Sequence, residues 1–255
     1  MSKSYPNATA FRQALESRLR TVAEQRGVQI QGLRLKVAIE RLLARLFEGD
    51  DPPWLLKGGY AMELRFRPKA RTTRDVDLTI GRPVDPSFLR KRLEEVHEEL
   101  QSAAESDLGD YFEFIIEPAR SEIQVAPGGG GVFPVVARMA GRDFARFHID
   151  VGFGDAVIGE AEALVGEHLL EFAGLPPAQA RAIPKAQQFA EKIHAYTFPW
   201  SDRENTRSRD LVDLVLLIER GGLDPDSVRE ALRRTFEHRA RHTLPKELSP
   251  PPNVW

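Results

Sequence analysis

The chain has 255 residues, with 36 Lys and Arg against 38 Asp and Glu, so its formal net charge is −2. It contains no cysteine, which excludes disulfides, thiolate nucleophiles, zinc fingers and iron–sulfur clusters. Hydrophobic residues make up 42% of the chain, which excludes wholesale disorder, and its length suits one large domain or two small ones.

Two amphipathic helices are predicted near the start of the chain. The first covers Ala10–Arg26 and ends at Gly27, and the second covers about Leu33–Phe47, before a break at Asp51–Pro53. Apolar residues recur at helical spacing in both segments, so each helix has one face to bury.

Strands and short helices alternate in the middle of the chain. A short apolar strand at Trp54–Leu56 leads into Gly58-Gly59 and a brief helix to about Phe66. The further predictions are a strand over Val76–Ile80, a helix over Pro86–Ala104, strands over Tyr111–Ile116, Phe133–Met139 and Phe144–Phe153, and a flexible turn at Pro127–Gly131.

From Pro184 onward the pattern is helical. One helix begins at Pro184, a second is capped by Ser208 and a third by Asp224. The apolar stripe of the second helix comprises Leu211, Leu214, Val215 and Ile218. These patterns predict an α/β fold with a core at about 30–155 inside a first unit of residues 1–175, and a helical second unit of residues 176–255.

Neither a membrane span nor a secretory signal is expected. No apolar run approaches the roughly 20 residues of a membrane helix, and the first six residues contain no hydrophobic stretch. We therefore expect a cytoplasmic protein without a membrane partner.

Charge is distributed unevenly along the chain. Arg65–Arg74 and Arg229–Lys246 are basic, whereas Arg90–Glu122 is acidic. A single charged segment of this kind is usually a face of the protein that is exposed to solvent. Two basic segments on one fold can also form a phosphate-binding surface that the net charge conceals.

A pair of carboxylates indicates metal chemistry. The strand alternation puts Asp75 and Asp77 on the same face, and oxygen-rich sites of this kind suit magnesium. By itself the pair is weak support, because many strands carry two exposed aspartates.

Two further features strengthen the interpretation. Gly58-Gly59 lies between a strand and a helix, where backbone N–H groups can approach a phosphate. Asp150 lies on the polar face of a later strand. This order is typical of the polymerase-β-like nucleotidyltransferase core, in which three carboxylates hold two metal ions.

Three segments carry a family resemblance. LLKGGYAMELRF…RTTRDVDL at 55–78, AEKIHAY at 190–196 and RDLVDL at 209–214 closely resemble the AbiEii/MenT nucleotidyltransferase toxins. The resemblance implies a toxin of a type IV-like toxin–antitoxin pair that uses Mg²⁺ or Mn²⁺ to transfer a nucleotide from an NTP. It also implies a cognate antitoxin and an RNA acceptor, the 3′ end of tRNA in the MenT branch, with translation blocked as the result.

The resemblance also assigns residues. It gives catalytic roles to Asp75, Asp77, Lys192 and Asp210, nucleotide binding to Gly58, Gly59 and Lys192, and metal ligation to Asp75, Asp77 and Asp150. Arg71 and Arg74 add charge for the triphosphate, and RNA binding is expected at Arg65, Arg67, Lys69, Arg233, Arg234, Arg239 and Arg241.

Some points remain open at this level. Asp210 either orients Lys192 or acts as a general base, and Asp213 either faces the cleft or lies on a helix surface. Relatives often carry Ser with Lys or Arg where this chain has Thr73-Arg74, and they continue beyond 250–255, so we expect a shortened or divergent acceptor-binding region. The alternatives are transfer to a protein hydroxyl, or a non-catalytic module that binds RNA or a partner protein.

Overall fold

A mixed sheet forms the centre of the computed structural model, which describes residues 5–49, 51–123, 126–199 and 205–252. Its strands are β1 (Leu55–Lys57), β2 (Asp75–Ile80), β3 (Glu113–Ile116), β4 (Ser121–Glu122), β5 (Gly130–Met139), β6 (Arg142–Phe153), β7 (Glu162–Val165) and β8 (Gln179–Ala182). Their order is β3-β5-β6-β2-β1-β8-β7, with β4 paired to β5.

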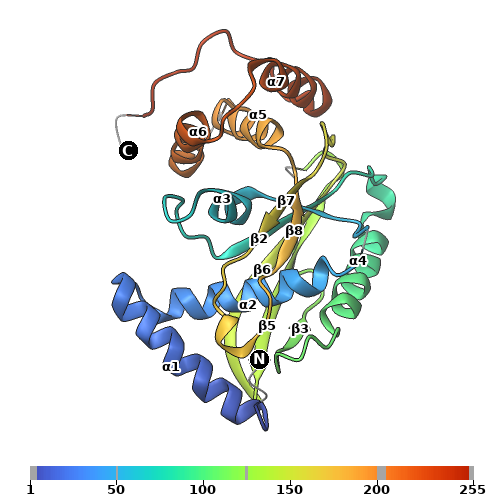
Figure 1. The fold of residues 1–255 in the computed structure, drawn as a ribbon. Helices are drawn as coiled ribbons and strands as arrows, with labels where there is room; N and C mark the ends of the chain where they lie inside the picture. Colours follow the sequence, from blue (N-terminus) through green and yellow to red (C-terminus); the bar gives the residue numbers. More distant parts are fainter. Residues whose placement is uncertain (1–4, 50, 124–125, 200–204, 253–255) are drawn as a thin grey trace.

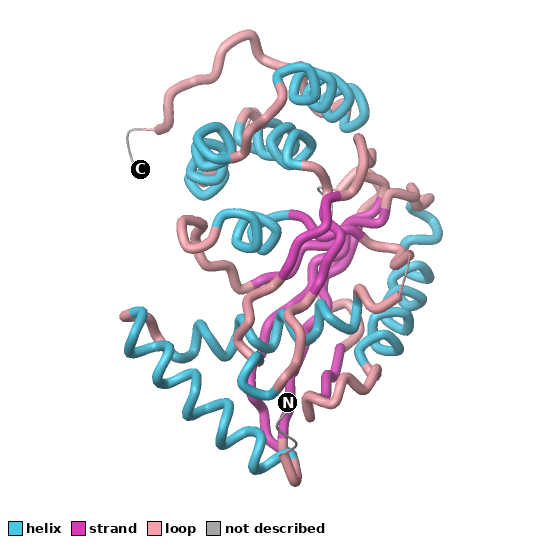
Figure 2. The backbone as a smooth tube through the Cα atoms, in the orientation of Figure 1, coloured by secondary structure: helices cyan, strands magenta, loops and turns pink. Residues whose placement is uncertain are grey.

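Helices cover the sheet and one of its ends. They are α1 (Ala8–Arg26), α2 (Ile30–Leu46), α3 (Gly58–Phe66), α4 (Leu89–Ala104), α5 (Lys185–Tyr196), α6 (Ser208–Arg220) and α7 (Pro225–Arg239), with short 3₁₀ turns at Pro86–Phe88 and Glu171–Ala173. Figures 1 and 2 show α5, α6 and α7 together at one end of the molecule, and α1 and α2 toward the other. Among the described residues no helix is long and apolar enough to cross a membrane.

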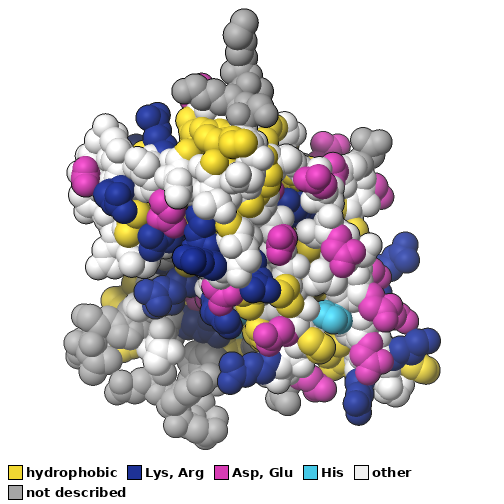
Figure 3. Space-filling view, turned by 90° about the horizontal axis from the view of Figure 1, so that it is seen from below, with side chains coloured by type: hydrophobic (Ala, Val, Ile, Leu, Met, Phe, Trp, Pro, Cys, Tyr) yellow, Lys and Arg dark blue, Asp and Glu magenta, His cyan; other side chains and the backbone are white. Residues whose placement is uncertain are grey.

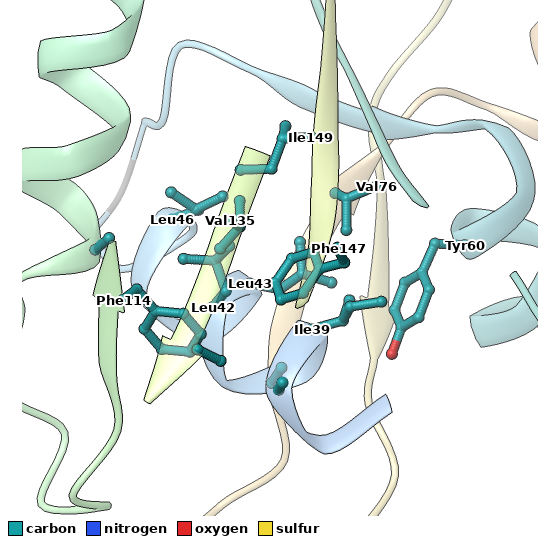
Figure 4. Packing of buried hydrophobic residues seen from close by; sticks show 14 of the residues in the cluster. Ile39, Leu42, Leu43, Leu46, Tyr60, Val76, Phe114, Val135, Phe147 and Ile149 are labelled. Carbon is teal, nitrogen blue, oxygen red and sulfur yellow. The ribbon is translucent and has the colours of Figure 1, made fainter. Parts of the chain in front are cut away.

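The first two helices form as the apolar spacing predicts. Phe11, Leu15 and Leu19 are buried on one side of α1, and the helix ends at Gly27, whose φ of 64° few other residues adopt readily. In Figure 4, Ile39, Leu42 and Leu43 of α2 point into the same cluster as side chains of the sheet. This packing places α2 across one face of the sheet.

The central strands have the predicted two faces. Val76, Leu78 and Ile80 of β2 are buried in the main core, so Asp75 and Asp77 lie on the opposite face. The second half of β6 pairs in parallel with the whole of β2, from Asp75 opposite His148 to Ile80 opposite Phe153. The core side of the sheet is thus apolar, and the other side carries the carboxylates.

The predicted flexible turn at Pro127–Gly131 is wrong in its second half. Gly130 and Gly131 belong to strand β5. A Cβ on Gly130 would lie 2.3 Å from the Val151 carbonyl oxygen, and one on Gly131 would lie 2.6 Å from a Leu93 methyl group. These glycines therefore allow a close approach inside the sheet.

Helix α6 differs from its prediction in two respects. Ser208 is its first helical residue and not its N-cap; the N-cap is Arg207, which makes no side-chain capping bond. Val215 and Ile218 are exposed, whereas Leu214 and Leu217 are buried. The amphipathic face is rotated because the helix packs against α3 as well as α5. By contrast, the Asp224 side chain caps α7 as predicted.

The sheet continues past the predicted core. β8 pairs in parallel with β1, and β7 pairs with β8. Neither strand is predicted from the sequence, because each is only four residues long. The division of the chain at residue 175 stays a prediction.

A buried carboxyl group on α2 makes the stability of the fold depend on pH. Glu40 is 4% exposed, and its carboxylate accepts hydrogen bonds of 3.0 and 2.8 Å from the Glu167 N–H. Burial raises the pKa of Glu40 to about 7, although the Glu167 N–H and Lys36 act in the opposite direction. Between the ordinary pKa and about 7, the folded chain binds a proton that the unfolded chain does not.

We predict that Glu40→Gln removes a pH-dependent loss of stability. In the native chain this group lowers the free energy of unfolding by about 3 kcal/mol as the pH rises through its window, and the loss is complete above about pH 7. Urea unfolding from about pH 5 to about pH 8 should show a flatter profile for the variant. The exposed Glu24→Gln is the control and should follow the native profile; equal slopes for all three proteins would contradict the prediction.

Candidate functional site

A cleft of about 330 Å³ lies between the carboxylate face of the sheet and the C-terminal helices. Its lining comes from β1, α3, β2 and β6 on one side and from α5, α6 and α7 on the other. The lining residues that carry chemistry are Lys57, Gly58, Asp77, Asp150, Gln188, Glu191, Lys192, Arg207, Asp210 and Arg239. Segments that are far apart in the sequence thus meet at one site.

Strand register places the predicted metal ligands side by side. Asp77 lies opposite Asp150 on the parallel strand β6, and opposite Lys57 on the antiparallel strand β1. Asp75 lies one pleat further along, beside His148, and the two side chains are 3.1 Å apart. The sequence puts Asp75 and Asp77 on one face, but only the sheet brings Asp150 to them.

Gly58 allows the strand and the helix to meet around Asp77. Its φ is 63°, and a Cβ there would lie 1.9 Å from Asp77 Oδ2 and 2.8 Å from Asp77 Cβ. The Gln188 side chain of α5 donates a 2.6 Å hydrogen bond to the Gly58 carbonyl. The Gly-Gly turn is therefore fixed from both sides of the cleft.

Two of the cleft carboxylates have raised pKa values. Burial raises the pKa of Asp77, while Lys57, Lys192 and the Gly59 N–H act in the opposite direction. Burial and the charge of Asp77 raise the pKa of Asp150 to about 6. Close, desolvated carboxylates of this kind store repulsion that a cation relieves.

The donors fit a hard divalent cation. Among the described residues, the buried Asp150 Oδ1 has no hydrogen-bond partner, and carboxylate oxygens are the ligands that Mg²⁺ and Mn²⁺ prefer. Within the residues that the structure describes, no three His, Asp or Glu side chains converge closely enough to hold a metal ion by themselves. Magnesium needs few protein ligands, since water and substrate phosphates supply the rest.

Lys192 is buried in the wall of the cleft. Its Nζ lies 3.0 Å from Asp210 Oδ1 and 2.7 Å from Asp213 Oδ2. Burial opposes the charge, but the two aspartates outweigh it and raise the pKa of Lys192. The structure brings Lys192 and Asp210 together, and it places Asp213 inside the protein rather than on the helix surface.

The arginines of the first basic segment do not form one surface. Arg65 has a buried side chain and donates to Glu162, Gln188 and the Ile183 carbonyl, so its expected contact with RNA is wrong. Arg67 donates to the Val165 and Gly166 carbonyls, whereas Lys69 is exposed.

The two arginines expected at the triphosphate lie beside the cleft. Arg71 bonds to Asp213 at 3.1 Å, and Arg74 is exposed next to Asp75. Neither belongs to the cleft lining among the described residues.

The second basic segment is divided between the surface and the cleft. Arg233 pairs with Glu230 and Glu237 on the outer face of α7, and Arg234 and Arg241 are exposed. Arg239 turns into the cleft and contacts Asp155 at 2.8 Å. The arginines expected to bind RNA are thus not equivalent.

The outer surface carries its charge unevenly. On the face shown in Figure 3, Lys and Arg side chains gather near the centre, and Asp and Glu lie mainly toward one side. The net charge of −2 therefore averages over regions of opposite sign.

Sequence reasoning missed five residues of the site. Four of them line the cleft, Lys57, Gln188, Glu191 and Arg207, and Asp155 lies directly behind it. A lysine next to Gly-Gly at the end of an apolar strand is a usable signal for Lys57. Asp155 follows β6 in a loop, so no periodic pattern marks it.

Comparisons with known proteins agree with this geometry. The family model described as nucleotidyl transferase AbiEii toxin, type IV TA system, matches residues 41–253. Comparison with curated protein sequences found no match.

Two solved structures can be compared with the chain. The MenT4 nucleotidyltransferase toxin from Mycobacterium tuberculosis H37Rv has a TM-score of 0.59 and 20% identity over 86% of this chain and 70% of its own. A proposed nucleotidyltransferase from H. pylori has a TM-score of 0.49 and 15% identity over 82% of this chain and 78% of its own. The predicted mixed α/β nucleotidyltransferase fold and the family resemblance are both confirmed.

We predict that Gly58→Ala destabilises the protein by about 2 kcal/mol, because alanine is strained at this φ and its Cβ displaces the whole Asp77 side chain. Thermal unfolding measures the effect. Gly32→Ala is the matched control, since Gly32 lies in helix α2 with nothing within 4 Å of an added Cβ. Equal melting temperatures for the two variants would refute the close packing of Asp77 on Gly58.

Proposed function

The chain belongs to the AbiEii family of nucleotidyltransferase toxins of type IV toxin–antitoxin systems, and from this premise we propose that it transfers a nucleoside monophosphate from an NTP to RNA. The proposed acceptor is the 3′ end of tRNA, the proposed metal is Mg²⁺ or Mn²⁺, and a cognate antitoxin restrains the activity. Transfer to tRNA in the cytoplasm would block translation.

The cleft is the observation that carries this proposal. It combines the adjacent carboxylates Asp77 and Asp150 with a glycine turn and a buried lysine, Lys192. Nucleotidyl transfer needs little covalent chemistry from the protein, because positioning and charge stabilisation do most of the work. This set of groups supplies both.

Each group then has a role. Asp75, Asp77 and Asp150 would hold the divalent metal, which supplies charge neutralisation at the phosphates when it is bound. Gly58 and Gly59 let the N-terminus of α3 approach the phosphates, and Lys192 contributes a fixed positive charge. Asp210 orients Lys192, in agreement with their 3.0 Å contact.

The acceptor strand needs cations outside the cleft. Lys69, Arg74, Arg234 and Arg241 are exposed and remain the proposed RNA contacts of the two basic segments. Binding that depends on such contacts weakens steeply with salt.

Two other functions are compatible with the same cleft. An exposed hydroxyl of a partner protein could replace the RNA 3′-hydroxyl as the acceptor. A non-catalytic binding module would not need two adjacent carboxylates beside a glycine turn, so the pairing of Asp77 with Asp150 next to Gly58 favours an enzyme.

We predict magnesium-dependent labelling of tRNA. The purified protein should transfer label from at least one of the four α-labelled NTPs to total tRNA, and EDTA should abolish the transfer. Label on added protein alone would contradict the tRNA acceptor. Absence of label on every acceptor, with Mg²⁺ or Mn²⁺, would contradict enzymatic function.

We predict that Asp77→Asn lowers the transfer rate by at least about 100-fold, because it removes a metal-binding charge. The control is Asp143→Asn on β6, since Asp143 is half-exposed at the far end of the strand and pairs with Arg146. A variant at Asp77 that transfers at the native rate would refute the site.

Lys192 requires a second measurement. Lys192→Ala leaves Asp213 buried without its closest cation, so we expect it to destabilise the fold by about 3 kcal/mol besides abolishing transfer. Loss of activity at this position therefore counts for the site only where circular dichroism shows a folded protein. Unchanged stability in Lys192→Ala would contradict the buried ion pair.

A further inference from the structure

A second charged cluster borders the cleft, and the family resemblance assigns no role to its acidic members. Lys57 Nζ donates to Asp155 Oδ2, and Arg239 Nη2 contacts the other oxygen, Asp155 Oδ1, at 2.8 Å. Glu191 Oε2 lies 3.4 Å from Arg239 Nη2 and 3.9 Å from Lys57 Nζ. One carboxylate thus joins a strand of the core to the last helix.

Asp155 is built to hold these cations. It is 1% exposed, and the Thr79 hydroxyl donates a third hydrogen bond of 3.1 Å to it. Burial opposes its charge, but Lys57 and Arg239 outweigh this effect and hold the pKa of Asp155 well below its usual range. Asp155 is therefore a permanent anion inside the protein.

The geometry separates the anion from the cleft. Lys57 and Arg239 both line the cleft, whereas Asp155 lies behind them and does not. An ammonium group has three donors and a guanidinium has five, so each cation keeps donors for a ligand while it is bound to Asp155. Without Asp155, the two cations would lie close together and would lose the carboxylate that bonds to both of them, while Glu191 lies 3.4 Å from Arg239 and 3.9 Å from Lys57.

The position of the cations fits one kind of ligand. Lys57 lies directly opposite Asp77 in the sheet register and immediately before the Gly58 turn. A triphosphate next to the carboxylates carries several negative charges and needs more than one cation. Lys192 is a single cation and is already paired with two aspartates, so it does not neutralise a triphosphate by itself.

We propose that Asp155 is a positioning residue that holds Lys57 and Arg239 in the wall of the cleft, where the two cations bind the triphosphate of the nucleotide. This inference rests on the proposed function and assigns the triphosphate to a particular side of the same cleft. It also gives the C-terminal helix α7 a part in nucleotide binding.

The test compares Asp155→Asn with a matched buried aspartate. Asp110 is also fully buried and held by two cations, Arg41 at 2.5 Å and Arg45 at 2.6 Å, but it does not line the cleft. With the NTP that the native protein uses, Asp155→Asn should raise the KM for that NTP at least about tenfold and leave the KM for tRNA unchanged within about twofold. Asp110→Asn should lower the melting temperature without a change in either KM.

A double variant shows whether Asp155 acts through Lys57. Lys57→Met leaves Asp155 paired with Arg239 and Thr79, so this variant is expected to fold, and it should also raise the KM for the NTP about tenfold. Asp155→Asn combined with Lys57→Met should raise it little beyond the larger single effect. Fully multiplicative effects would overturn the positioning role.

Binding of inorganic tripolyphosphate separates this inference from the proposed function. Calorimetry needs no transfer reaction, and the dissociation constant should rise about tenfold in Lys57→Met and in Asp155→Asn. Native-like binding of tripolyphosphate in both variants would overturn the inference even where tRNA is labelled. If both variants bind tripolyphosphate more weakly and the native protein transfers no label, the triphosphate site is supported and the proposed transfer activity is overturned.

Discussion

The contact between Gly58 and Asp77 is the constraint on which the rest of the site depends. Since the Asp77 side chain occupies the space that a Cβ on Gly58 would need, strand β1, helix α3 and strand β2 can meet only with glycine at this position. The contact fixes the N-terminus of α3 beside a carboxylate, and parallel pairing of β2 with β6 adds Asp150. A site for a metal and for phosphates follows from one close approach of the backbone.

Charge pairing then attaches the C-terminal helices to this core. Lys192 is held between Asp210 and Asp213, and Arg239 reaches Asp155 behind the strands. Arg71 adds a link from the core to Asp213. Because buried pairs of this kind cost much to break, the helices carry the cations of the cleft in fixed positions rather than on mobile side chains. The same pairing explains why a chain with a net charge of −2 can present positive groups to a phosphate.

The local spacing of apolar residues predicted most of the elements that bury a single apolar face in the core. α1, α2 and β2 formed close to the expected bounds because their spacing of apolar residues is regular. The pattern of apolar residues gave a wrong prediction where a segment contacts two neighbouring elements. Gly130 and Gly131 entered a strand because another backbone and a leucine pack against them, and Val215 and Ile218 stayed exposed because α6 packs on two helices. The pairing of β7 and β8 with the sheet left no signal in strands of four residues each.

The sequence by itself determined that Asp75 and Asp77 share a face, that Gly58-Gly59 lies between a strand and a helix, and that chemistry must come without cysteine. These features depend on residue type and on spacing along one segment. Only the tertiary structure decided that Arg65 faces inward, that Asp213 is buried against Lys192, and that Asp155 connects Lys57 to Arg239. Such pairs join residues far apart in the chain, and no local period encodes which partner a buried charge will meet.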